Sequence, residues 1–327
     1  MKRRAFIKLL GGAAAWPLAA RAQQGKTPVI GYLHSLTRSE VPEVVGAFLG
    51  GLREAGFVDG HNVAVEYRFA EGWFERLPEL AADLVRRRVE VLAAAGGSPS
   101  VLAAKAATTT IPIVSMTGDV DPVQAGIVAS LNRPGGNITG VSLLGGFLGP
   151  KRLEILRELV PRSAVVAVLV NPSNRNAEPD VKEVEGAVRA AGLKLVVTRA
   201  TANTEFRPVF ASLVQQQVDA LIVTADPIFT HRRAELTALT AAHRIPAIYQ
   251  WPDFVKVGGL ASYGTTLTEA SRQVGTYVGR VLKGVRPADL HVTQPTKFHL
   301  VINLKAAKAL GLDVPPTLLA RADEVIE

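Results

Sequence analysis

A duplicated segment constrains the fold of this chain more than any other feature. Residues 111–130 read IPIVSMTGDVDPVQAGIVAS, and residues 245–262 read IPAIYQWPDFVKVGGLAS. Each copy has an Ile-Pro entry and a short apolar run, then a polar loop with Pro and Asp, then a Gly before another apolar stretch. This order predicts a buried strand that ends in a loop. Loops at the carboxyl ends of strands in an open α/β sheet bind ligands, so two copies predict two sheets facing one site.

Strand-like and helix-like patterns alternate before and after the first copy. Apolar residues recur at helical spacing in three segments, 41–54, 77–85 and 101–107. β-type runs, which predict strands, occur in four segments, 28–33, 63–69, 89–95 and 137–143. Such alternation is typical of a parallel sheet with helices on both faces.

The same scheme starts again at Lys151. Ala191-Gly192-Leu193 corresponds to Ala55-Gly56-Phe57, and residues 218–221 correspond to 89–92, with an offset of roughly 130 to 136 residues. The sequence therefore predicts two similar lobes, each a doubly wound parallel sheet, with a ligand cleft between them.

The segment after Tyr263 matches neither copy. It contains one helical pattern at 274–282 and one β-type run at 297–302, and we expect each to complete a different lobe. The chain then crosses between lobes near 140–145, 263–266 and 287–295, where Gly and Pro are frequent. This gives an N-terminal lobe of 28–142 plus 264–293 and a C-terminal lobe of 143–263 plus 294–327.

The first 22 residues have the features of an export signal. A basic start precedes an apolar stretch, 9–20, which is shorter than the roughly 20 residues that span a bilayer as a helix. Arg3-Arg4-Ala5-Phe6-Ile7-Lys8 matches the twin-arginine pattern, and Ala20-Arg21-Ala22 predicts cleavage after Ala22. An ordinary secretory signal is the alternative. Either route predicts a periplasmic protein.

Charge and composition exclude several classes of function. The formal net charge is +8, but five basic residues of the signal carry +5, which leaves too little to predict nucleic-acid binding. The chain has no cysteine, so disulfides, thiolate metal sites and a lipidated cysteine are excluded. Its six histidines show no metal-ligand spacing, and no nucleophile elbow or dinucleotide motif occurs. We expect no metal, no cofactor and no catalytic residue.

Several segments resemble one known family. They are Ile30-Gly31-Tyr32-Leu33, residues 66–72 leading to 77–81, Asp121-Pro122-Val123 with Arg133-Pro134-Gly135-Gly136-Asn137-Ile138-Thr139-Gly140, and Asn303-Leu304-Lys305-Ala306-Ala307. The chain resembles the substrate-binding proteins of ABC transporters typified by tryptophan and tyrosine importers. That resemblance implies the type I periplasmic-binding fold and delivery of a ligand to an ABC permease.

The loops that follow the expected strands contain the residues that we predict to contact the ligand. Hydroxyl groups and backbone N–H groups suit a carboxylate, Asp suits an ammonium or hydroxyl, and aromatic rings suit an apolar body. The nominated residues follow the expected strands of both lobes: Ser35, Gly97, Ser98, Thr117, Gly118 and Asp119 in the first, and Asn171, Ser173, Asn174, Asp226, Tyr249, Trp251 and Tyr263 in the second.

These observations predict a monomeric solute-binding protein that closes around a small aromatic or amino-acid-like ligand. Hinge closure is a known use of two such lobes. A sensor that reports to a membrane receptor is one alternative, and an exported α/β enzyme is another.

Overall fold

The computed structural model describes residues 27–143 and 148–327. The expected export signal, residues 1–22, lies outside the described residues, and so does Gly145 in the first expected crossing. Among the described residues, none of the helices combines the length and apolar character needed to cross a bilayer.

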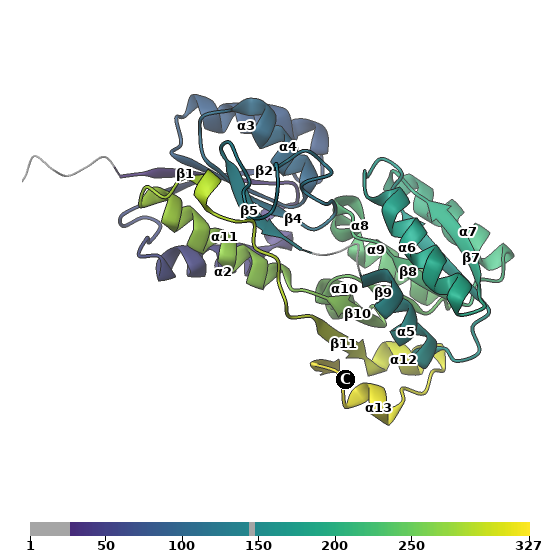
Figure 1. Cartoon of the computed structure of the whole chain (residues 1–327). Coiled ribbons are helices and arrows are strands. Elements are labelled where there is room, and N and C mark those ends of the chain that lie inside the picture. The colour runs from purple at the N-terminus through teal and green to yellow at the C-terminus, as the bar shows by residue number, and fades with distance from the viewer. Residues whose placement is uncertain (1–26, 144–147) are drawn as a thin grey trace, which may run out of the picture.

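The first lobe is built on a five-stranded sheet in which all strands are parallel. Its central strands are buried on both faces, which explains their nearly continuous apolar sequence. Helices α3 and α4 cover one face, and α11 (Leu267–Leu282) and α2 lie on the other (Figure 1). In spatial order the strands are β2 (Ala64–Phe69), β1 (Val29–His34), β3 (Val91–Ala95), β4 (Ile113–Thr117) and β5 (Ile138–Ser142), and the helices are α2 (Pro42–Glu54), α3 (Leu77–Arg86) and α4 (Ser98–Ala107).

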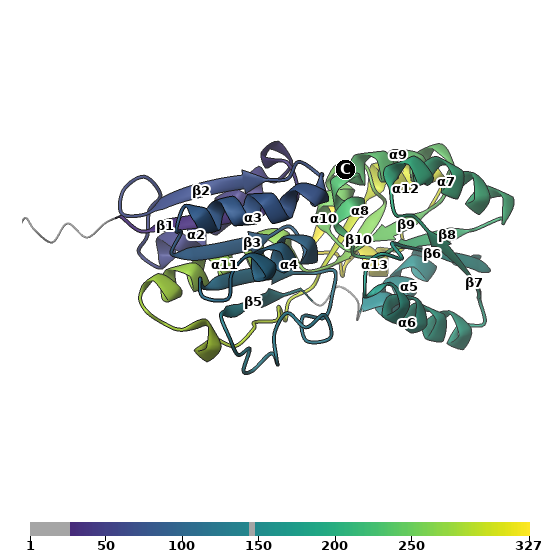
Figure 2. The same ribbon diagram turned by 90° about the horizontal axis from the view of Figure 1, so that it is seen from above.

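The second lobe has a seven-stranded sheet with helices on both faces. Figure 2 shows α5 and α6 on one side of this sheet and α7 and α9 on the other. The strands in spatial order are β12 (Glu324–Ile326), β11 (His299–Asn303), β10 (Ala261–Gly264), β9 (Ala247–Tyr249), β8 (Ala220–Val223), β6 (Val165–Val170) and β7 (Lys194–Arg199). The helices are α5 (Gly149–Leu159), α6 (Ala177–Ala190), α7 (Phe206–Gln215), α8 (Pro227–His231), α9 (Arg233–Ala242), α10 (Pro252–Lys256), α12 (Leu304–Leu310) and α13 (Pro316–Leu319).

One strand pair corrects the expectation of two wholly parallel sheets. Strand β11 runs antiparallel to β10, with Ser262 opposite Val301. The chain leaves the second lobe at the end of β10, adds a helix to the first lobe, and returns at the same edge (Figure 1). Because the chain re-enters the sheet beside the carboxyl end of β10, β11 must run in the opposite direction to β10.

The helix added to the first lobe, α11 (Leu267–Leu282), packs directly against α2. The two backbones approach closely because a methyl group on Gly51 would overlap the carbonyl oxygen of Arg272. On α11, a methyl group on Gly275 would overlap the carbonyl oxygen of Phe48. The Ser271 hydroxyl also donates to the carbonyl oxygen of Val44 over 2.8 Å. Gly51 and Gly275 therefore allow α11, from the C-terminal part of the chain, to pack closely on α2, from the N-terminal part.

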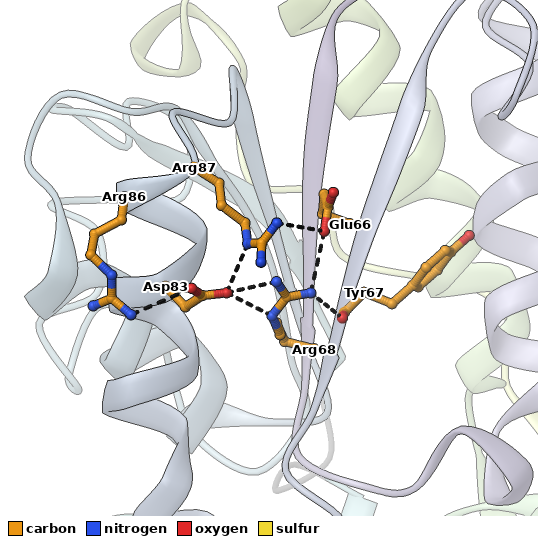
Figure 3. A network of polar contacts seen from close by, with 6 residues as sticks. All are labelled: Glu66, Tyr67, Arg68, Asp83, Arg86 and Arg87. Carbon is orange, nitrogen blue, oxygen red and sulfur yellow. Dashed lines mark hydrogen bonds and ion pairs between the residues drawn. The ribbon is translucent and has the colours of Figure 1, made fainter.

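An ion-pair network connects the edge strand β2 to α3 (Figure 3). The Asp83 carboxylate accepts hydrogen bonds from Arg68 Nε at 2.9 Å and Nη2 at 2.6 Å, and from Arg87 Nε at 3.0 Å. These bonds lower the pKa of Asp83, Arg68 being the first cause. Glu66 completes the network, 3.4 Å from Arg68. Glu66 and Arg68 of this network belong to residues 66–72, one of the segments that resemble the known family.

We predict that Gly51→Ala destabilises the protein by about 2–4 kcal/mol, because the added methyl group forces α2 and α11 apart. Gly46→Ala, on the same helix, is the matched control. Nothing lies within 4 Å of a methyl group at that position, so the change should stabilise the helix by roughly 0.5–1 kcal/mol. Urea unfolding measures both, and equal effects of the two substitutions would contradict the close contact.

Candidate functional site

A cavity lies between the lobes, at the carboxyl ends of strands from both sheets. Its empty volume, including the part open to solvent, is about 500 Å³. Strands β1, β3 and β4 lead to it from the first lobe, and β8 and β9 lead to it from the second. The described residues that line it are His34, Leu36, Val41, Val44, Gly96, Gly97, Met116, Gly118, Asp119, Leu143, Ala225, Asp226, Pro227, Thr230, Trp251 and Leu267.

Polar contacts join the two lobes beside the cavity. His231, at the end of α8, lies with Nδ1 3.1 Å from Oε1 of Glu40 in the first lobe. The Arg233 guanidinium donates to the carbonyl oxygen of Glu40 over 3.1 Å, and Lys256 is paired with Glu43 at 2.9 Å. The lobes therefore touch each other in this structure.

Two glycines allow the lobes to meet closely. A methyl group on Gly97 would come within 2.7 Å of Pro227, across the cleft, and the φ of 96° at Gly97 also favours glycine. A methyl group on Gly118 would lie 3.2 Å from the Trp251 ring. Side chains at these positions would hold the lobes apart.

Asp119 provides a buried carboxylate from the first lobe, directly after β4. Its Oδ1 accepts a hydrogen bond from the backbone N–H of Ser98 at 2.9 Å, and its Oδ2 accepts one from the Ser98 hydroxyl at 2.5 Å. Burial raises the pKa of Asp119, although the bonds from Ser98 act in the opposite direction. The carboxylate therefore sits at the start of α4 and accepts from the first N–H of that helix.

Asp226 provides a second buried carboxylate from the opposite lobe, after β8. Its Oδ1 caps α8 by accepting from the N–H of Ile228 at 2.8 Å. Its Oδ2 accepts from the side-chain amides of Asn171 and Asn174, both at 3.1 Å. Burial and then the charge of Asp119 raise the pKa of Asp226 to about 6. The two acids therefore interact electrostatically across the cleft.

The rest of the lining is mostly apolar. Trp251, Met116 and Leu143 are each less than 5% exposed. His34 adds no fixed charge, because burial lowers its pKa to about 4, and its Nδ1 accepts from the N–H of Leu36 at 3.0 Å. The cavity thus combines two acids with an apolar surround.

The structure brings many of the nominated residues to this site. Gly97, Gly118, Asp119, Asp226 and Trp251 line the cavity. Three more hold its carboxylates, namely Ser98, Asn171 and Asn174. Two others lie in the adjoining strand ends and are buried: the Ser35 hydroxyl donates to the carbonyl oxygen of Gly96, and the Thr117 hydroxyl has no hydrogen-bond partner among the described residues.

Three nominated residues lie elsewhere. Tyr249 is fully buried in the core of the second lobe, with its ring stacked on Phe254 and its hydroxyl 3.0 Å from that of Thr240. It belongs to β9 itself, and the polypeptide reaches the cavity only at Trp251, in the loop that follows. Tyr263 packs against Phe298 with the two rings tilted, and Ser173 is exposed.

Sequence reasoning missed most of the apolar lining and one buried amide. Val41 and Val44 face the cavity from the start of α2, and Leu267 does so from the start of α11. Nothing in their local pattern separates them from ordinary core positions. Gln250 is fully buried, and neither polar atom of its amide has a hydrogen-bond partner among the described residues. It lies between Tyr249 and Trp251 in the duplicated segment, next to the cavity lining and not in it.

Comparisons with known proteins agree with this geometry. A family model described as ABC transporter substrate binding protein matches residues 34–326. A tyrosine-binding protein of Clostridioides difficile is 28% identical over 266 residues, covering 81% of this chain and 75% of the relative. The crystal structure of an ABC domain from Streptococcus pneumoniae in complex with L-Trp is 25% identical and superposes with a TM-score of 0.83, covering 92% of this chain and all of the other.

A third comparison concerns the arrangement of the lobes. The ligand-free, open structure of a substrate-binding protein from Clostridium difficile is also 25% identical, covers 91% of this chain and 99% of the other, and has a TM-score of 0.68. The higher TM-score with the L-Trp complex, at the same identity, indicates that the lobes described here are arranged more like the ligand-bound relative. This agrees with the polar contacts between them.

We predict that Asp119→Asn stabilises the ligand-free protein at pH 7.5 by about 1–2 kcal/mol, because it removes a buried ionisable group whose charged form burial disfavours. The pKa of Asp119 is raised on folding, so the ionised carboxyl destabilises the wild type increasingly as pH rises. The gain should therefore shrink as the pH falls from 7.5 to 5.

Thermal unfolding at both pH values measures this effect. Asp121→Asn is the matched control, because Asp121 lies in the same loop but caps the N–H groups of Val123 and Gln124 outside the cavity. A variant at Asp119 that is less stable than the wild type at pH 7.5 would contradict the electrostatic interpretation.

Proposed function

Because the chain belongs to the family of ABC transporter substrate-binding proteins, we propose that its interlobe cavity captures one small organic ligand by closure of the two lobes. The observation that carries this proposal is the cavity itself, which is formed by strand-end loops of both sheets and contains acidic and aromatic side chains from opposite lobes. A ligand that contacts the side chains of both lobes holds the lobes together.

The lining supports a ligand of aromatic or amino-acid-like character. Trp251 offers an aromatic surface, and Met116 and Leu143 extend the apolar contact. A relative binds tyrosine and a similar structure contains L-Trp, so ligands with an amino group and an apolar body are the first to test. An ABC permease in the inner membrane would receive the ligand.

The three connections between the lobes would act as the hinge. They join β5 to α5, β10 to α11, and α11 to β11. Each lobe keeps its own sheet and core, so a change of backbone angles in these connections opens the cleft without unfolding either lobe.

The cellular setting follows from the family and from the first 22 residues. We propose export by the twin-arginine route, removal of the signal after Ala22, and a free monomer in the periplasm. Nucleic acid is not an expected partner, since most of the formal charge lies in the signal.

The ligand would leave the protein unchanged. Both carboxylates of the cavity already accept hydrogen bonds from donors at helix starts, Asp119 from Ser98 and Asp226 from Ile228, and these bonds fix their positions. A binding role therefore accounts for their placement better than acid–base catalysis.

A ligand screen tests the proposal. The mature protein should show a raised unfolding temperature with one compound or a narrow group of compounds, drawn from amino acids, amines, aromatic acids and nucleosides. Mass spectrometry should recover the bound compound intact. Absence of any stabilising compound, or conversion of the compound, would overturn the proposal.

We predict that Trp251→Ala weakens binding of the compound found in this screen by at least about tenfold, because it removes the aromatic wall of the cavity. Trp73→Ala is the matched control, since Trp73 is 62% exposed and lies outside the cavity lining. Isothermal titration calorimetry measures both variants. Equal losses of affinity would mean that Trp251 has no special role.

A further inference from the structure

A histidine of the second lobe inserts into the first lobe outside the cavity. His231 ends α8, and its Nδ1 lies 3.1 Å from Oε1 and 3.2 Å from Oε2 of Glu40, in the short helix η1 (Arg38–Glu40). A methyl group built on Gly72, in the loop after β2, would overlap Nε2 of the same ring. The imidazole is therefore held between a carboxylate and a glycine of the opposite lobe.

The charge of Glu40 assigns the donor in this contact. Burial alone would raise the pKa of Glu40, but hydrogen bonds from His231 and Thr37 lower it to about 2, so the carboxylate is ionised at neutral pH. An ionised carboxylate only accepts hydrogen bonds. Nδ1 of His231 therefore carries a hydrogen and donates it to Glu40, whether or not the ring is charged.

Each side of the contact is fixed within its own lobe. In the first lobe, Oε2 of Glu40 accepts from the backbone N–H of Thr37 at 3.0 Å. In the second lobe, the Arg233 guanidinium donates to the carbonyl oxygen of Thr230 at 2.9 Å. The same guanidinium donates across the cleft to the carbonyl oxygen of Glu40 at 3.1 Å. Groups that are already ordered lose little conformational entropy when they meet, so this contact forms at little entropic cost.

Burial separates this contact from the ion pair of Lys256 with Glu43, which also joins the lobes. The side chains of His231 and Glu40 are 16% and 24% exposed, whereas those of Lys256 and Glu43 are 44% and 67% exposed. Water and salt screen an exposed pair, so it contributes little. A hydrogen bond to a partly buried carboxylate is stronger. Of these two contacts, the one at His231 therefore holds the lobes more strongly.

The contact lies beside the cavity and outside its lining. Thr230, immediately before His231, and Val41, immediately after Glu40, line the cavity, whereas His231, Glu40 and Gly72 do not. All groups of the contact belong to the protein, so it can form without a ligand. When it forms, it brings residues of the cavity lining together from both lobes.

We propose that His231 and Glu40 form a latch that favours the closed arrangement of the lobes before a ligand binds. Gly72 provides the space for the imidazole, and Arg233 adds a second hydrogen bond across the cleft. The latch raises the affinity for a ligand that requires the closed form, because less of the binding free energy is used for closure. The inference rests on the proposed closure around a solute and adds residues outside the cavity that control it.

Distances between two spin labels test the latch in the protein without ligand. The chain has no cysteine, so Glu79→Cys on α3 and Arg207→Cys on α7 place one exposed label in each lobe (Figure 2). Double electron–electron resonance should resolve a closed population of the mature protein. Glu40→Gln should lower the ratio of closed to open molecules at least about fivefold, because an NH₂ group replaces one of two oxygens that accept hydrogen bonds. Glu43→Gln, the matched control at the exposed ion pair, should change the ratio less than about twofold.

Two glycines of the first lobe give an independent test. Gly72 and Gly60 have φ values of 80° and 78°, so alanine causes similar backbone strain at both positions. A methyl group on Gly72 meets the His231 ring, whereas nothing lies within 4 Å of one on Gly60. Gly72→Ala should therefore lower the closed population as Glu40→Gln does, and Gly60→Ala should leave it unchanged. The double variant Gly72→Ala/Glu40→Gln should be no more open than either single variant, because both substitutions break one contact.

A wild type without a closed population would overturn the latch, and so would equal effects of Glu40→Gln and Glu43→Gln. These measurements do not involve a ligand. A failed ligand screen would therefore count against solute capture and leave the latch intact.

Discussion

The direction of the strands is the constraint on which the binding site depends. Strands β1, β3 and β4 in one lobe and β8 and β9 in the other all end at the cleft, and their loops supply the cavity lining. Parallel pairing makes this possible, because it places successive strand ends at one edge of each sheet. The duplicated segment contributes β4 and β9 with the loops that follow them. Two copies of one local design thus meet face to face.

Close backbone contacts determine how nearly the two halves approach. Gly97 and Gly118 leave space for Pro227 and Trp251 from the other lobe, and Gly51 lets α11 pack on α2 within the first lobe. The contact between α2 and α11 and the contacts across the cleft have different roles. The helix pair anchors a segment that has already crossed from the second lobe, whereas the glycines of the cleft permit contact that a hinge can make and break.

The electrostatics of the cavity couple ligand binding to closure. With the lobes in contact, Asp119 and Asp226 are both buried in the lining of one cavity, and both have raised pKa values. Opening the lobes returns these carboxyl groups to water and reduces the cost. A ligand that pairs with these carboxyl groups offsets the same cost with the lobes closed, so its affinity for the closed form exceeds that for the open form. Such a difference in affinity is what shifts the population toward closure.

The sequence by itself predicted the alternation of strands and helices, the two similar α/β lobes and several of the loops that line the cavity, because these follow from local periodicity and from internal repetition. It also placed Asp119, Asp226 and Trp251 in loops that follow strands, where their side chains take no part in packing the sheet. Only the tertiary structure decided which loop residues face the cavity. Tyr249 and Trp251 are two positions apart, yet one lies in the core and the other in the cleft, because the strand ends between them. The contributions of Val41, Val44 and Leu267, and the antiparallel β11, depend on how distant segments pack, and no local pattern specifies them.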